Sequence, residues 1–143
     1  MRMNLMGWTA AAILLTAGAA SAETLHFAAT LKGADEVPAN ATKGTGKVAA
    51  SLDTTTKKFT YKVTYSGLTG PATMAHFHGP AAPGANAGPV VPVPKDALAS
   101  PMKGAATLDD AQIADLKAGR WYFNIHTAAN PGGEIRGQLA AGK

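Results

Sequence analysis

The sequence predicts an all-β protein, an antiparallel Greek-key β-sandwich of seven or eight strands with one short helix. Short segments in which apolar and polar residues alternate with a period of two occur along most of the chain, and this is the pattern of half-buried strands. Turn-forming residues separate these segments, including many of the 16 glycines and 9 prolines. A single stretch has helical signals at both ends. Many short strands with one helix favour a β-sandwich.

The first 22 residues have the pattern of a cleaved signal peptide. Arg2 supplies a positive start, an apolar run follows over residues 8–19, and residues 20–22 (Ala-Ser-Ala) match the small-x-small cleavage pattern. The apolar run is too short to cross a bilayer, which takes about 20 apolar residues. We therefore expect a periplasmic or secreted protein, with residues 23–143 as a single domain and no membrane insertion after cleavage.

Eight segments have the strand pattern. The third, with Phe59, Tyr61 and Val63 facing one way, has the most regular alternation, and it is expected to form a hairpin with the second. The fifth contains prolines, which lack the donor that a ladder needs, so it is expected at an edge. The last two are separated by a short Gly-rich loop and are expected to pair. In chain order the segments are 25–31, 48–52, 59–65, 72–78, 90–93, 103–108, 121–125 and 135–139.

One helix is predicted over Asp109–Ala118. Thr107 is the expected N-terminal cap, because Asp110 follows three residues later in the spacing of a capping box. Gly119 stands where a helix would end. The helix is therefore bounded by sequence signals on both sides.

Composition and charge exclude several functional classes. Lysine and arginine number 13 against 9 acidic residues, a formal net charge of +4, but no basic run interleaved with aromatics occurs, so nucleic-acid binding is not expected. The chain has no cysteine, which excludes disulfides and cysteine catalysis. It also has no G-x-S-x-G motif and no phosphate loop. Glu36, Asp109 and Asp110 are assigned to ordinary loop and helix-cap positions.

Three of the four histidines are predicted to share one polar face. His76 and His78 are two residues apart on a strand, so they point to the same side of it. His126 falls on the polar face of a later strand. Three imidazoles with an open position are the ligand set of a mononuclear copper or zinc site, and the alternative is that each ring only hydrogen-bonds a neighbour. His26, facing outward on the first strand, is predicted to be a surface residue.

Other side chains are expected on the same face. Arg136 is predicted there, either beside the imidazoles or paired with Glu134 or another acid. Met74 is either a soft ligand for copper or a packing residue. Tyr122, Asn124 and Glu134 are candidates to orient the imidazoles from behind.

Several motifs together resemble the CHRD domain, which is named after repeats in the extracellular protein chordin and also occurs in exported bacterial proteins. The resemblance extends from about Leu25 to Leu139. In chordin it implies a binding or structural role. The motifs are FxAxLxG with EVP (residues 27–38), YSGLTG (65–70), AHFHGPA (75–81), NIHT (124–127) and PGGEIRGQ (131–138).

The His-x-His strand that follows Gly-Leu-Thr is also similar to copper-zinc superoxide dismutase, a Greek-key β-sandwich. That similarity implies one copper ion held by His76, His78 and His126, with Arg136 as the catalytic residue that attracts the superoxide anion. The bridging histidine and zinc cluster of that enzyme are missing, so zinc is less expected than copper. Three functions stay open: a copper redox enzyme, a copper carrier or buffer, and a metal-free binding or adhesion module.

Overall fold

The computed structural model describes residues 17–19 and 21–142. Most of the predicted signal peptide, including residue 20 of its cleavage pattern, lies outside the described residues. In the part that is described, no helix is long and apolar enough to cross a membrane. The folded elements begin at Thr24.

The described residues form nine strands, one α-helix and two 3-10 helices. The strands are β1 (Thr24–Lys32), β2 (Thr45–Asp53), β3 (Lys58–Ser66), β4 (Ala72–His78), β5 (Pro89–Pro92), β6 (Met102–Thr107), β7 (Tyr122–Thr127), β8 (Ile135–Gln138) and β9 (Ala140–Ala141). The helices are α1 (Asp110–Lys117), η1 (Gly33–Asp35) and η2 (Lys95–Ala97). All eight predicted strands are present. The ninth, β9, was not predicted, because two exposed alanines carry no alternation.

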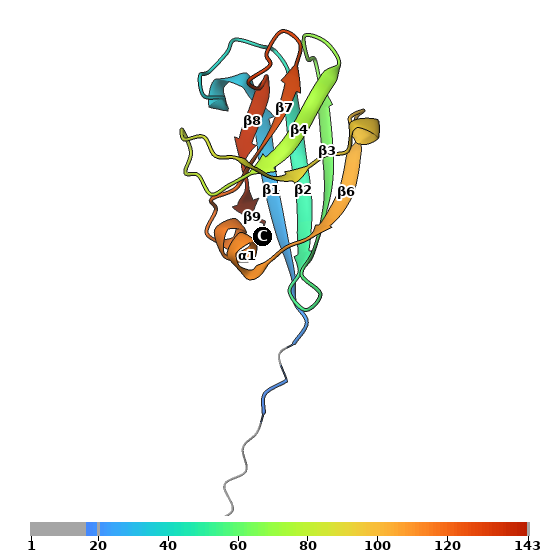
Figure 1. The fold of residues 1–143 in the computed structure, drawn as a ribbon, viewed down its shortest axis with the longest axis vertical. Coiled ribbons are helices and arrows are strands. Elements are labelled where there is room, and N and C mark those ends of the chain that lie inside the picture. Colours follow the sequence, from blue (N-terminus) through green and yellow to red (C-terminus); the bar gives the residue numbers. More distant parts are fainter. Residues whose placement is uncertain (1–16, 20, 143) are drawn as a thin grey trace, which may run out of the picture.

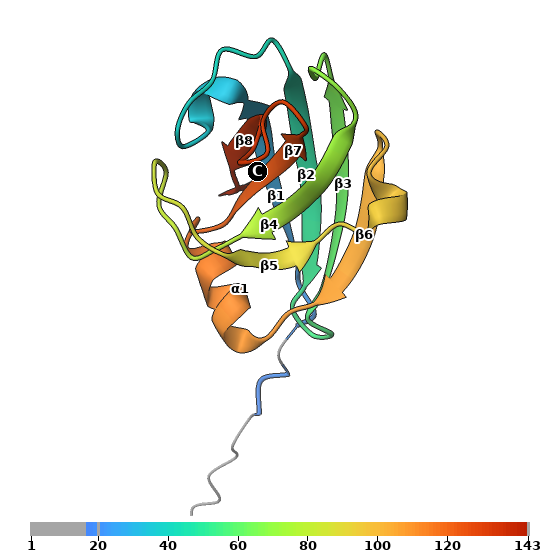
Figure 2. The same ribbon diagram turned by 45° about the horizontal axis from the view of Figure 1, so that its top comes forward.

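The strands are arranged in two layers (Figure 1, Figure 2). Along the hydrogen-bonded ladder the order is β5-β4-β7-β8-β1-β2-β3-β6, with β9 paired to β1. The first four strands of this order make one layer, and the last four make the other. The chain crosses between layers from β3 to β4, from β5 to β6 and from β6 to β7. The predicted antiparallel Greek-key sandwich with one short helix is therefore confirmed, and so is the hairpin of β2 with β3.

An aromatic cluster fills the space between the layers. Phe59, Phe77, Trp121 and Phe123 are fully buried. The ring centroids of Phe59 and Phe77 lie 5.1 Å apart across the two layers, and those of Phe77 and Phe123 lie 4.6 Å apart on neighbouring strands. Burying each ring contributes about 1.5–3 kcal/mol. Because these residues of β4 and β7 point inward, their neighbours along each strand point to the outer face.

The cap of α1 differs from the prediction. Asp109, not Thr107, is the N-terminal cap: its carboxylate accepts a bond from the backbone N–H of Gln112 at 2.8 Å, and the Gln112 side chain accepts one from the Asp109 N–H at 3.0 Å. Thr107 is the last residue of β6, where pairing with β3 keeps it extended. The predicted stop is correct, since Gly119 has a φ of 72° and donates its N–H to the carbonyl of Leu116 at 3.1 Å.

Candidate metal centre

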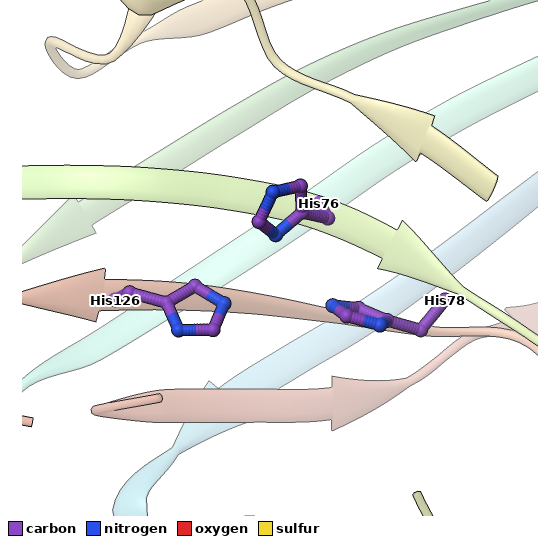
Figure 3. Close-up of side chains that lie close together, drawn as sticks. All are labelled: His76, His78 and His126. Carbon is purple, nitrogen blue, oxygen red and sulfur yellow. The ribbon is translucent and has the colours of Figure 1, made fainter. Parts of the chain in front are cut away.

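Three imidazoles converge on the outer face of the layer that contains β4 and β7 (Figure 3). In the antiparallel register His76 lies opposite Asn124 and His78 opposite Tyr122, while His126 is two residues further along β7. The ring centroid of His76 lies 5.2 Å from that of His126 and 5.3 Å from that of His78. One nitrogen of each ring lies within 4.8 Å of the other two, so the three predicted residues could hold one metal ion.

His126 presents a nitrogen that has no hydrogen-bond partner. Its Nδ1 lies 2.8 Å from the carbonyl oxygen of Pro131, which can only accept, so Nδ1 carries the proton and Nε2 carries the lone pair. That Nε2 is buried and finds no partner among the described residues, and the same holds for Nδ1 of His76. Burying an unsatisfied polar atom costs about 1–3 kcal/mol. A bound metal ion would satisfy both nitrogens.

His78 is held at both of its nitrogens. Nδ1 lies 2.9 Å from the carbonyl oxygen of Ala87 and therefore donates, which leaves the lone pair on Nε2. Nε2 lies 2.9 Å from Oδ1 of Asn124, which in this orientation of the amide is also an acceptor. Two lone pairs that face each other attract a proton or a metal ion. Tyr122, whose ring stacks on that of His78 with the centroids 4.7 Å apart, thus has the predicted position behind an imidazole, whereas Asn124 lies against the nitrogen that carries the lone pair.

The surroundings favour the neutral imidazoles that bind metals. Burial lowers the pKa of His76, and the nearby rings of His126 and His78 lower it further. Burial also lowers the pKa of His78, and the acceptor oxygens of Ala87 and Asn124, which favour the protonated ring, only partly offset that effect. At neutral pH both rings therefore keep a lone pair available.

Arg136 lies on the same side of the layer, opposite Asn124 in the pairing of β7 with β8. It is 2% exposed, and its guanidinium lies 3.4 Å from the ring centroid of Tyr122. Its two terminal nitrogens donate to the side chain of Asn86, at 2.8 Å, and to the carbonyl of Ala85. Its partners are therefore the 79–88 loop and Tyr122 rather than Glu134, the acid that the sequence offered as an alternative.

Glu134 does not contact the imidazoles, in contrast to the expectation that it would orient them. Its carboxylate is fully buried and accepts bonds from the side chains of Thr42, Thr69, Thr127 and Asn130. Burial alone would raise its pKa, but the bonds from Thr69, Thr127 and Thr42 outweigh that effect and hold the pKa below its ordinary value. Glu134 is thus an anchor for three loops, including the one that follows His126.

Glu36 is the residue near the site that the sequence analysis missed, since it was assigned to an ordinary loop position. It is 5% exposed, and its Oε1 has no hydrogen-bond partner within the described chain. The carboxylate packs against the Cα of Gly133, which has a φ of 129° and leaves no room for a side chain. Burial raises the pKa of Glu36 to about 7, opposed by the charge of Arg136 and a bond from Asn124. The Glu36-Val37-Pro38 motif was the signal that could have identified it.

Replacing Glu36 with glutamine is expected to flatten the pH dependence of stability. The folded-state pKa of about 7 lies above the ordinary value of 4.5, so its stabilising contribution is fully present below pH 4.5 and is lost as the pH rises through 7. That loss is on the order of 2 kcal/mol. Urea unfolding of the metal-free protein at pH 4.5 and pH 8 measures this change in the free energy of unfolding. Exposed Asp96→Asn is the control, and an unchanged difference between the two pH values in Glu36→Gln would contradict the prediction.

The fold and the site define an antiparallel β-sandwich with a candidate three-histidine metal centre on the outer face of one layer. The CHRD domain model matches residues 27–139, and the chain belongs to this family. The match runs from within β1 to the end of β8 and includes the three clustered histidines and Arg136. Comparison with curated proteins and with solved structures found no match.

Proposed function

We propose that this protein binds a single copper ion through His76, His78 and His126, and that the bound ion reacts with superoxide. Two observations carry the proposal: one nitrogen of each of the three rings lies within 4.8 Å of the others, and His76 and His126 each have a buried nitrogen without a partner in the described residues. Imidazole suits copper and zinc alike. Three protein ligands leave a position open, which is typical of reactive rather than structural sites.

The protein's own residues would hold and surround the ion. Hydrogen bonds to Pro131 and Ala87 fix the protons of His126 and His78 on Nδ1, so that Nε2 of each ring would be free to donate its lone pair to a metal ion. His76 is only half-buried, which leaves the site open to a small anion. When bound, copper would supply one-electron chemistry: one superoxide is oxidised to dioxygen, and a second, with two protons, is reduced to hydrogen peroxide. The charge of Arg136, fixed behind Tyr122, would favour an anion near the site.

Copper stoichiometry and activity of one sample test the proposal. We expect one equivalent of Cu(II) to bind with a nitrogen-rich EPR signal, and the loaded protein to dismutate superoxide. The double variant His76→Ala, His78→Ala should lose both properties. Bound copper without activity would overturn the redox part. An EPR spectrum of free or nonspecific copper in the wild type would overturn the whole proposal and favour a metal-free binding module.

A second candidate function, carriage of Cu(I), is favoured by the position of Met74. This residue lies directly opposite His126 in the β4–β7 register, on the same face as His76. Its side chain is 43% exposed, and no other large apolar side chain of the described residues is classed as exposed. A thioether is a soft ligand that favours Cu(I).

Replacing Met74 with leucine is expected to weaken Cu(I) binding by about tenfold, since a soft ligand is lost while the imidazoles remain. Competition with a chromophoric Cu(I) chelator measures this affinity. Cu(II) affinity of the same variant is the control and should change by less than about twofold, because Cu(II) relies on the nitrogens. Equal losses for the two oxidation states would count against a Cu(I)-specific role of Met74.

A further inference from the structure

The layer opposite the imidazoles has an outer face with an unusual distribution of charge. Outward residues of β1, β2, β3 and β6 alternate with the core positions and consist mainly of lysine, threonine, serine and alanine. The one carboxylate among them, Asp53, accepts bonds from the N–H groups of Thr55 and Thr56 at 2.8 and 2.9 Å. We call this surface the lysine face, after its five lysines: Lys32, Lys47, Lys58, Lys62 and Lys103.

Three of these lysines form a cluster at its centre. Lys62 lies directly opposite Lys103 in the pairing of β3 with β6. Lys47 lies opposite Thr64 on β3, which places it diagonally beside Lys62. Like charges directly opposite each other destabilise a sheet. Within the described chain none of the three has an ion-pair partner, so the fold keeps an uncompensated positive cluster at a cost.

Two shallow depressions lie beside this cluster. One, of about 320 Å³, is lined by Ser51, Thr60 and Lys62, among others. The other, of about 270 Å³, is lined by Lys47, Thr64 and their neighbours, which include Thr30, Thr45 and Ser66. Each depression combines an ammonium group with hydroxyl groups. Such a pair can bind a carboxylate and the hydroxyls beside it, which are the groups that repeat along an acidic polysaccharide.

We infer that the lysine face binds a linear acidic polysaccharide. The positive cluster complements a polymer of repeated negative charges, and the small side chains between the lysines let an extended chain approach the sheet. A lipid bilayer is a poorer match, since this face has no large apolar side chain to insert among the described residues. A single-stranded nucleic acid is also a poorer match, because no phenylalanine, tyrosine or tryptophan ring of the described residues is exposed there for stacking, and the imidazole of His26 is the one exposed ring. The inference does not depend on the metal centre, which lies on the other layer.

Binding of polygalacturonate, a carboxylate polymer, tests the inference. The triple variant Lys47→Gln, Lys62→Gln, Lys103→Gln should bind it at least about tenfold more weakly, with a smaller dependence on salt concentration. The matched control Lys43→Gln, Lys95→Gln, Lys117→Gln removes the same charge outside the lysine face and should stay within about twofold of the wild type. Amide NMR shifts of the wild type on titration should concentrate on β2, β3 and β6.

Three outcomes would overturn the inference. Equal losses of affinity for polygalacturonate in the two triple variants would mean that only the net charge of the protein determines binding. Shifts confined to other strands would place the polymer elsewhere. Binding to phosphatidylglycerol vesicles without binding to polygalacturonate would identify a membrane as the partner instead. The circular dichroism of each variant establishes that it is folded, which is expected because the replaced side chains are exposed.

Discussion

Replacing His126 with alanine is expected to weaken copper binding by at least roughly 100-fold. Loss of a residue that merely supports a ligand costs 10–100-fold in metal affinity, so loss of a ligand should cost no less. His126 is the best placed of the three, because its Nδ1 is bonded to Pro131 and its buried Nε2 has no partner in the described structure. Titration against a competing copper chelator measures the change.

The control for this experiment is the fourth histidine. His26 is exposed on β1, in the opposite layer, and His26→Ala should leave copper affinity within about twofold of the wild type. Removing the ring of His126 also removes an unsatisfied buried nitrogen, so the metal-free variant should remain folded. A His126→Ala protein that binds copper as tightly as the wild type would exclude this ring as a ligand.

The fold was predictable because its strands alternate cleanly. Phe59, Tyr61 and Val63 face the core as expected, and the prolines of β5 place it at an edge of its layer. The two errors have local causes. Thr107 has the spacing of a cap, but pairing with β3 holds it in a strand. The alanines of β9 carry no pattern, and they pair with β1 because the chain continues past β8 along an open edge.

The site was predictable in its ligands but not in its surroundings. His76 and His78 share a face by the geometry of any strand, and the alternation around His126 placed that residue on a polar face. Sequence patterns do not reveal which loop folds over a face. The 79–88 loop holds Arg136, and Asn124 is buried as well, although alternation alone would leave both residues on the surface. Glu36 was missed for the same reason.

The carboxylate of Glu134 connects the site to the stability of the whole fold. Its partners come from the loop before β2, the loop after β3 and the loop between β7 and β8. The last of these loops also contains Pro131, whose carbonyl sets the proton position of His126. Hydrogen bonds to a charged acceptor contribute about 1.5–3 kcal/mol each, and donors left buried without an acceptor cost about 1–3 kcal/mol each.

Replacing Glu134 with alanine is therefore expected to lower the free energy of unfolding by about 3–5 kcal/mol, which is among the larger effects of single substitutions. Urea denaturation of the metal-free protein measures the change. Asp96→Ala is the matched control: because Asp96 is exposed, this substitution should lower the free energy of unfolding by less than about 0.5 kcal/mol.

Glu134→Gln provides a second measurement if the alanine variant does not fold. It keeps the shape and one acceptor oxygen but turns an –NH₂ group towards the hydroxyls of the loop threonines. We expect it to be intermediate in stability. It should also bind copper more weakly than the wild type, because the loop that positions Pro131 against His126 is loosened. A Glu134→Gln protein that matches the wild type in both properties would show that this carboxylate anchors the loops without its charge, and that the imidazole site is held by the sheet alone.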